Sequence, residues 1–415
     1  MNLDKAMVIV GGGQCGARAA HALRANGWEG AIRLIGNERR LPYERPPLSK
    51  GVLLGEWDAS QCEVYGEAFY REQEIDVIVD SPVLQIERQR QVARLADGRD
   101  IAYSRLLLAT GAAPRTLTVP GNDLPGIQVL RTDVDANEIA RELLPGRRIV
   151  VIGAGFIGLE VAAAAVRKGC EVIVLEAAPR ALMRAVPASV SDLIVDMHRA
   201  MGVDVRFDVQ VRRFAGERRV FGVELAGGET LPCDLAIVGV GVQPRSELAE
   251  ACGLLVDNGV VVDAMLRTTD PAIFAAGDVC SFEHPLFNRR VRLECWKNAE
   301  DQARVAASNM LGREEKCGFV PWFWSDQYDT TIQIAGLPSL GSTTVVRETG
   351  ATSRVFFALS SDGVLVGASG IGTTGEIAKD IRISQDLIAK QARPSPAALM
   401  DRTVKLRSLL VAEAQ

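Results

Sequence analysis

The 415-residue sequence has only three histidines, and none of its eight cysteines stands in a Cys-x-x-Cys pair. Zinc sites need closely spaced sets of these two residue types, so no metal site is expected. The formal net charge is −5, without the basic excess that binds nucleic acids or anionic membranes. The longest uncharged run, 330–346, has 17 residues and includes polar ones, so no membrane span is expected.

The N-terminus lacks the features of a signal peptide. Asp4 and Lys5 are followed by only five apolar residues and then by three glycines, with no cleavage site. We therefore expect a cytoplasmic protein, whose scattered cysteines are mostly small buried side chains. At roughly 150 residues per domain, the length predicts two or three domains.

Two copies of a strand–turn–helix pattern lie about 140 residues apart. In the first copy a strand at 7–10 precedes a helix at 17–25, and the turn contains Gly11, Gly13 and Gly16. In the second copy a strand at 149–152 precedes a helix at 159–168, and the turn contains Gly153, Gly155 and Gly158. Both copies match the Gly-x-Gly-x-x-Gly turn of dinucleotide-binding domains.

The chemistry of this turn explains its glycines. The first allows a tight bend, the second lets a pyrophosphate approach the backbone, and the third lets the helix pack on the strand. An acidic residue after the next strand binds the adenosine ribose, and Glu38 and Glu176 occupy these positions. Glu176 favours NADH, because a carboxylate repels the 2′-phosphate of NADPH. Arg180 and Arg184 lie close enough in sequence to bind such a phosphate, or they are solvated surface residues.

The rest of the chain indicates a domain boundary near Ser246 and a third, α+β domain from Pro321 onward. Further strands are expected at 83–86, 92–95, 106–108, 235–240 and 273–275, and further helices at 296–311 and 376–390. A glycine-rich turn is expected at 370–375.

The stretch 42–50, PYERPPLSK, resembles one found in NADH-dependent ferredoxin reductases, which serve Rieske-type aromatic-ring dioxygenases and bacterial cytochrome monooxygenases. The resemblance continues through the segments 109–111, 130–132, 153–158, 268–278, 294–299 and 324–328. It covers nearly the whole chain in order. It implies a glutathione-reductase-like α/β fold with two Rossmann-like domains. An FAD domain, 1–113 with 246–320, would be interrupted by an NAD domain, 114–245, and followed by a C-terminal α+β interface domain, 321–415.

The resemblance also implies residue roles. FAD would be held by Gly11, Gly13, Gly16, Glu38, Arg45, Lys50, Val83, Thr110, Gly111, Arg131, Asp278 and Trp296. NAD would be held by Gly153, Gly155, Ile157, Gly158, Glu176, Arg184 and Gly241.

Three residues are implied to act in electron transfer. Lys50 and Glu160 would approach each other beside the flavin nitrogen that accepts hydride, where an ammonium favours the reduced ring. Without the resemblance, a solvated Lys50 and a Glu160 that only packs its helix are the default interpretation. Trp324, with Trp322 and Phe323 adjacent, would form an aromatic patch where electrons leave, although packing explains these aromatics equally well.

The cysteine positions distinguish disulfide reductases of this fold from reductases that pass electrons to another protein. Disulfide reductases of this fold need two thiols four residues apart after the first acidic residue, and no cysteine lies between Glu38 and Ser60. We therefore predict an NADH:ferredoxin oxidoreductase that passes single electrons to an acidic 2Fe–2S ferredoxin docked near the flavin edge. Basic residues suited to docking are Arg289, Arg290, Arg292, Lys297, Lys379 and Arg382.

The sequence alone is also compatible with other functions. They are a rubredoxin reductase, an NADH oxidase, and a redox-sensing flavoprotein resembling apoptosis-inducing factor. The oligomeric state, monomer or homodimer, is also open. Cys15 occupies a position close to the expected flavin, so its redox reactivity is a further question.

Overall fold

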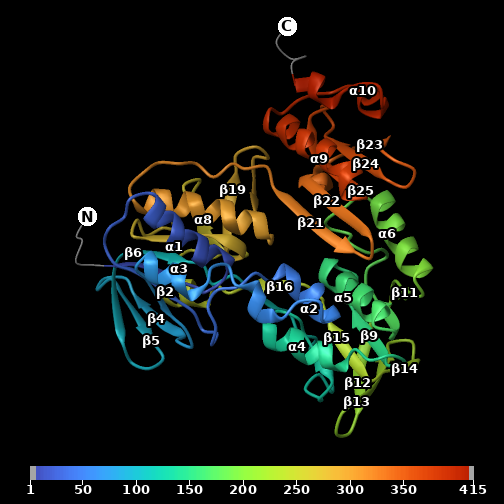
Figure 1. Cartoon of the computed structure of the whole chain (residues 1–415), viewed down its shortest axis with the longest axis horizontal. Coiled ribbons are helices and arrows are strands. Elements are labelled where there is room, and N and C mark those ends of the chain that lie inside the picture. Colours follow the sequence, from blue (N-terminus) through green and yellow to red (C-terminus); the bar gives the residue numbers. More distant parts are fainter. Residues whose placement is uncertain (1–5, 411–415) are drawn as a thin grey trace. The chain divides into compact units, whose positions relative to one another are not determined.

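The computed structural model describes residues 6–410, which form two compact units. The first unit comprises the chain up to Glu44, Ser60–Ala113 and Gln243–Phe319. The second comprises Arg45–Ala59, Pro114–Val242 and the chain from Val320 onward. The regions 114–245 and 321–415, predicted as separate domains, thus lie largely in one unit, and the predicted domain limits stay a prediction (Figure 1).

The first unit is built on a seven-stranded sheet with the order β3-β2-β1-β6-β5-β4, in which β18 also pairs with β6. Its parallel strands are β1 (Ala6–Val10), β2 (Ile32–Ile35), β3 (Ile75–Ile78), β6 (Asp100–Leu108) and β18 (Ile273–Ala275). The antiparallel strands are β4 (Val83–Glu87) and β5 (Val92–Leu95). Every residue of β1 is buried, as expected for a parallel strand covered on both faces.

Helices α1 (Gln14–Ala25) and α8 (Trp296–Met310) pack against each other in this unit (Figure 1). Both are as predicted, although α1 begins three residues earlier, inside the glycine turn. The remaining elements of the unit are α3 (Glu67–Glu72), α7 (Glu247–Ala251), β17 (Val260–Val262), β19 (Cys280–His284) and β20 (Arg289–Val291).

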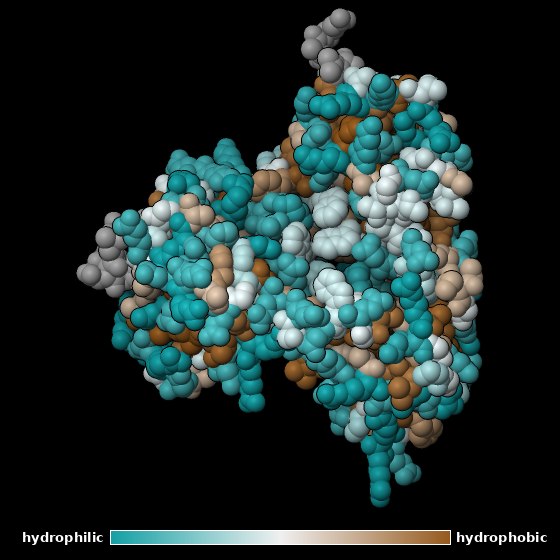
Figure 2. Space-filling model, in the orientation of Figure 1, coloured by the Kyte–Doolittle hydropathy of each residue, from teal (hydrophilic) through white to brown (hydrophobic). Residues whose placement is uncertain are grey.

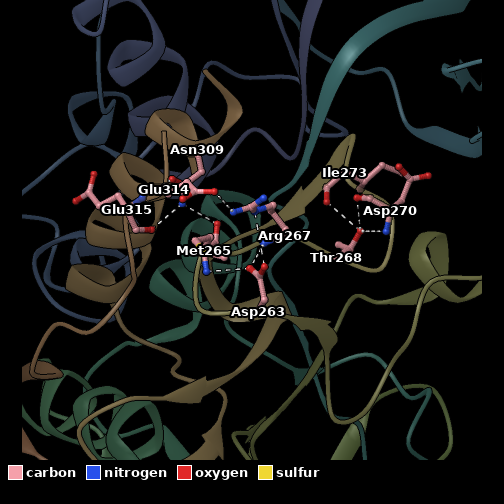
Figure 3. Close-up of polar contacts among 9 residues, drawn as sticks. All are labelled: Asp263, Met265, Arg267, Thr268, Asp270, Ile273, Asn309, Glu314 and Glu315. Carbon is pink, nitrogen blue, oxygen red and sulfur yellow. Dashed lines mark hydrogen bonds and ion pairs between the residues drawn. The ribbon is translucent and has the colours of Figure 1, made fainter. Parts of the chain in front are cut away.

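The turn that leads into β18 is held by side chains shown in Figure 3. The Asp263 carboxylate accepts hydrogen bonds from the backbone N–H groups of Met265 and Arg267, at 2.8 and 2.9 Å. The Thr268 hydroxyl bonds to the carbonyl of Ile273 at 2.9 Å and accepts from the Asp270 N–H at 3.1 Å. These contacts fix the start of β18, whose end leads to Asp278.

The second unit contains a parallel sheet of the order β11-β10-β9-β15-β8. Its strands are β8 (Ile127–Gln128), β9 (Arg148–Ile152), β10 (Glu171–Leu175), β11 (Asp204–Arg206) and β15 (Leu235–Val238). A three-stranded sheet adjoins it in sequence, made of β12 (Val211–Gly216), β13 (Val220–Leu225) and β14 (Thr230–Pro232). The helices are α2 (Gly51–Leu54), α4 (Asp133–Glu142), α5 (Phe156–Arg167) and α6 (Ala188–Ala200). Short strands β7 (Ala112–Pro114) and β16 (Val242–Pro244) lie where the chain passes from one unit to the other.

The C-terminal part of the second unit is an antiparallel sheet of the order β21-β22-β25-β24-β23, with α9 packed on it (Figure 1). The strands are β21 (Trp322–Gln327), β22 (Thr330–Gly336), β23 (Thr343–Glu348), β24 (Arg354–Leu359) and β25 (Leu365–Gly372). The helices are α9 (Thr374–Ala389) and α10 (Pro396–Met400).

The turn predicted at 370–375 is shorter than expected, because β25 continues to Gly372 and α9 begins at Thr374. A side-chain carbon at Gly370 would come within 3.1 Å of Ile377 and Ile381 of α9. The glycine therefore serves close packing of a helix on a strand, which the sequence pattern of a turn imitates.

No helix within residues 6–410 combines the length and the apolar character needed to cross a membrane. The large exposed apolar side chains are spread over many elements, from Trp57 and Leu84 to Phe221 and Met400. On the face drawn in Figure 2, side chains of intermediate hydropathy gather over β21.

Candidate functional site

The first glycine turn connects β1 to α1 in the first unit. Gly11 has a φ of +130°, and a side chain there would collide with the Ala109 carbonyl. A side chain at Gly16 would collide with the Gly11 carbonyl. Gly13 is different, because a side-chain carbon there would meet nothing within 4 Å. The protein's own packing requires the outer two glycines but leaves the space beside Gly13 open.

The second glycine turn, between β9 and α5, repeats this arrangement in the second unit. Gly153 has a φ of +105°, and a side chain there would collide with the Gly239 carbonyl. A side chain at Gly158 would collide with the Gly153 carbonyl, whereas one at Gly155 meets only the Gly239 oxygen, at 4.0 Å. The middle glycine again faces open space.

Both middle glycines are the N-cap residues of their helices, and neither helix start has a side-chain cap. The first N–H groups of each twelve-residue helix are thus directed to a space without a capping oxygen from the chain. An anion is stabilised at such a place by these donors and by the helix dipole. The residues present therefore fit two dinucleotide pyrophosphates, one in each unit.

The two acidic residues differ in their surroundings. Glu38 accepts a hydrogen bond from the Tyr43 hydroxyl at 2.5 Å. Glu176, directly after β10, accepts from the backbone N–H groups of Ala154 and Ala178, each at 2.8 Å. A carboxylate oxygen has two lone pairs, so each oxygen of Glu176 can still accept a ribose hydroxyl.

The arginines near Glu176 are not equivalent. The guanidinium of Arg180 donates to the carbonyls of Val186 and Met183, at 3.0 and 2.8 Å. Arg180 is therefore used to brace its own loop rather than to bind a phosphate. Arg184 approaches Gly241, since its Nη2 would lie 3.6 Å from a side-chain carbon built there. Ile157 lies in the second glycine turn, at the start of α5, and is 47% exposed.

In the first unit, Asp278 follows β18 in a short 3₁₀ helix (Gly277–Val279), and Cys15 lies against this segment. Burial and the nearby Asp278 raise the pKa of the Cys15 thiol far above its usual range. A thiol that stays protonated is a poor nucleophile, so we expect low reactivity of Cys15 in the folded protein. Thr110 donates to the Arg245 carbonyl at 2.7 Å, and Val83 begins β4 by pairing with Leu95.

Trp296 begins α8, as predicted, and the Arg18 guanidinium lies 6.0 Å from its ring centre. Arg292 and Lys297, close to Trp296 in sequence, are paired with acids. Lys297 contacts Asp301 at 2.6 Å and Glu300 at 3.2 Å, and Arg292 contacts Glu294 at 2.5 Å. Their charge is thus largely neutralised within the unit, which weakens them as a docking site for an acidic partner.

In the second unit, Lys50 and Glu160 form an ion pair with 2.8 Å between Nζ and Oε2. The Glu160 side chain is 2% exposed and that of Lys50 is 22% exposed. Ser49 and Ser325 both donate to Glu160, the latter at 2.5 Å. Arg45 and Arg131 also lie together in this unit, where Arg45 donates to the Arg131 carbonyl at 2.5 Å. The default interpretation of a solvated Lys50 therefore does not hold.

Trp324 and Trp322 stack on one face of β21, with ring centres 5.2 Å apart. Phe323 lies on the opposite face and contacts Phe156 of α5 at 4.5 Å. The predicted patch of three aromatics is thus wrong for Phe323, because neighbouring residues of a strand point to opposite faces.

The sequence patterns did not indicate the polar side chains that surround Glu160 and continue from it. They are Ser49, His198, Ser325, Gln327 and Tyr328. A signal was present, since Ser325 and Gln327 occupy alternate positions of a strand and therefore share one face. His198 is 130 residues away from Tyr328, and no local pattern connects them.

Comparison with known proteins agrees with this geometry. The family model described as pyridine nucleotide-disulphide oxidoreductase matches residues 5–303, and the model described as reductase C-terminal matches 322–410. The chain is 42% identical to the anthranilate 1,2-dioxygenase system ferredoxin–NAD(+) reductase component of Burkholderia cepacia, over 97% of this chain and 98% of that one. It is 40% identical to rubredoxin–NAD(+) reductase of Pseudomonas putida, over 80% of this chain and 86% of that one. The crystal structure of a covalent putidaredoxin reductase–putidaredoxin complex matches with a TM-score of 0.94 and 37% identity, covering 100% of both chains.

Proposed function

Because the chain belongs to the pyridine nucleotide-disulphide oxidoreductase family, we propose that it is an FAD-dependent NADH:ferredoxin oxidoreductase that serves an oxygenase. The family assignment confirms the predictions of a glutathione-reductase-like fold and of an oxidoreductase that uses FAD and NAD(H). The observation that carries the proposal is the end-to-end similarity to a ferredoxin–NAD(+) reductase.

The missing thiol pair supports the same proposal. The sequence has no cysteine from 39 to 61, and the buried hydroxyl of Ser49 bonds to Glu160. With no disulfide to reduce, electrons have to leave for an external acceptor. FAD, when bound, supplies the chemistry that takes a hydride as an electron pair and gives the electrons up one at a time.

The residues of the chain then have distinct proposed roles. The open spaces beside Gly13 and Gly155 admit the pyrophosphates of FAD and NADH respectively, and Glu176 binds the NADH ribose. Lys50 supplies a positive charge that favours the reduced ring, and Glu160 holds its ammonium in place. The roles of Arg45, Arg131, Asp278 and the other implied cofactor-binding residues rest on the family resemblance.

The proposed acceptor is an acidic 2Fe–2S ferredoxin, and Trp324 is the proposed exit for electrons. The exposed Arg289 and Arg290 in the first unit and the exposed Lys379 in the second remain the candidates for docking, since Arg292, Lys297 and Arg382 each contact an acid. A cytoplasmic location and the oligomeric state, monomer or homodimer, stay predictions.

A second candidate is a rubredoxin reductase, which the 40% identity to such an enzyme favours. The two are separated by measuring NADH-driven reduction of cytochrome c by the FAD-loaded protein, with Rieske-type and plant-type 2Fe–2S ferredoxins and with a rubredoxin. Strong stimulation by a 2Fe–2S ferredoxin is expected. Stimulation by rubredoxin alone would replace the proposal with the second candidate. Stimulation by neither carrier, with flavin still reduced by NADH, would contradict both.

A further inference from the structure

Glu160 is the centre of a buried hydrogen-bond network in the second unit, which we call the Glu160 network. Its Oε2 contacts Lys50 and the Ser49 hydroxyl, and its Oε1 accepts from the Ser325 hydroxyl. A carboxylate removed from water is costly unless a cation and hydrogen-bond donors replace the lost solvation. The elements packed on α5 contribute Lys50 as its ion-pair partner. Their other charged groups point elsewhere, because Arg148 pairs with Asp234 while Glu171 and Asp326 are exposed.

The Glu160 network continues beyond Ser325 through side chains that are almost fully buried. Gln327 donates from Nε2 to the Ser325 oxygen at 3.1 Å. His198 Nε2 lies 2.8 Å from Gln327 Oε1, and the Tyr328 hydroxyl lies 3.1 Å from His198 Nδ1. The exposed fractions of Ser325, Gln327 and His198 are 0, 1 and 0%. No water is needed to explain any of these contacts.

The direction of every hydrogen bond in the Glu160 network follows from the carboxylate of Glu160, which pairs with Lys50. A carboxylate has no hydrogen to donate, so Ser325 uses its single hydrogen on Glu160 and accepts from Gln327. Gln327 must then turn its amide nitrogen to Ser325 and its oxygen to His198. His198 in turn carries its hydrogen on Nε2 and accepts from Tyr328 at Nδ1. In the opposite direction Ser325 would give its hydrogen to Gln327, and Glu160 Oε1 would lose the donor that it has in the structure.

His198 suits this task because its two ring nitrogens are held in different roles. Burial lowers the pKa of His198, so the ring is neutral and one nitrogen must be an acceptor. With Nε2 as the donor, Gln327 cannot rotate its amide without placing two donors against each other. A free amide at Gln327 would instead compete with Glu160 for the hydrogen of Ser325.

We propose that His198 is a positioning residue for the Lys50–Glu160 pair: through Gln327 and Ser325, it fixes the hydrogen bond that Glu160 Oε1 receives. The inference rests on the proposed role of Lys50 in flavin reduction. It adds to that role a residue on α6, which touches neither Lys50 nor Glu160 and which no local sequence pattern singles out.

The test compares FAD-loaded variants in stopped-flow reduction by NADH. His198→Leu removes both ring nitrogens, whereas His198→Gln keeps an amide donor near the place of Nε2. Loss of one hydrogen bond between neutral groups corresponds to about fivefold, so we expect about a fivefold slower limiting rate for His198→Leu. The NADH concentration for half-maximal rate should not change, and His198→Gln should lie within about twofold of the wild type.

A double-mutant cycle with Lys50→Ala separates positioning from general destabilisation. If His198 acts through the ion pair, His198→Leu slows the wild type but adds no further loss in the Lys50→Ala background. Equal losses in both backgrounds, or no recovery in His198→Gln, would refute the positioning role. Gln327→Leu makes the same test if His198→Leu does not fold. A wild-type rate for Lys50→Ala would instead overturn the proposed function of Lys50, which is a different outcome from a wild-type rate for His198→Leu alone.

Discussion

Replacing Glu176 by alanine tests how the chain selects its nicotinamide cofactor. Both carboxylate oxygens of Glu176 already accept from backbone N–H groups at 2.8 Å, which fixes their position beside the Gly153 turn. A hydrogen bond from a ribose hydroxyl to such a charged group contributes about 1.5–3 kcal/mol. Repulsion of a 2′-phosphate near the protein surface adds about 1 kcal/mol or more. Together they give about 3 kcal/mol, or roughly a hundredfold preference for NADH.

The assay is the ratio of kcat/KM for NADH and NADPH, measured with ferricyanide as a common acceptor. Glu176→Ala should lower this ratio by roughly a hundredfold. Glu176→Gln is the matched control, because it keeps the shape and one acceptor but removes the charge, and it should show a smaller fall. We expect little gain with NADPH from Arg180, which is already bonded to carbonyls of its own loop. A ratio for Glu176→Ala within twofold of the wild type would refute the reasoning.

Three further predictions concern residues away from the nicotinamide site. The Arg347 side chain, 7% exposed, pairs with Asp380 and donates to four carbonyls between 399 and 404. Arg347→Met should therefore lower the free energy of unfolding by about 3–5 kcal/mol and make the segment 399–404 sensitive to proteolysis. The control Arg382→Met, at an exposed arginine, should do neither. Burial lowers the pKa of His284, so the unfolded chain binds a proton that the folded one does not; thermal stability should therefore fall as pH drops below about 6.5, and His284→Gln should show a smaller fall. Cys15 should resist iodoacetamide at pH 8 in the folded protein, and its rapid labelling, seen by mass spectrometry, would contradict the burial described above.

The glycine turns show which part of the site a sequence can predict. The positive φ of Gly11 and Gly153 and the tight packing of Gly16 and Gly158 are local demands, so the spacing alone predicted both turns and the helices after them. No local sequence pattern predicts the Glu160 network. It brings together residues from four separate segments, and whether a serine or glutamine is buried depends on which elements pack together.

Two of the sequence predictions were only partly right, because one pattern serves two structures. Glycine at 370 is typical of a turn, but here it lets α9 pack closely on β25, and the turn begins only after Gly372. Adjacent aromatics at 322–324 suggest one patch, but strand geometry places Phe323 against α5 and the two tryptophans on the other face. The pairing of Arg292 and Lys297 with acidic residues was likewise not predicted, although two of the acids lie only two to four residues away.

The central claim is that electrons from NADH pass through this chain to a ferredoxin one at a time. The most direct measurement reduces the FAD-loaded protein with one equivalent of NADH under anaerobic conditions and mixes it with excess oxidised 2Fe–2S ferredoxin in a stopped-flow instrument. The account predicts that two ferredoxins are reduced for each NADH, with return of the oxidised flavin spectrum. A flavin that stays reduced in the presence of every 2Fe–2S ferredoxin tested, but is reoxidised by rubredoxin or oxygen, would contradict it.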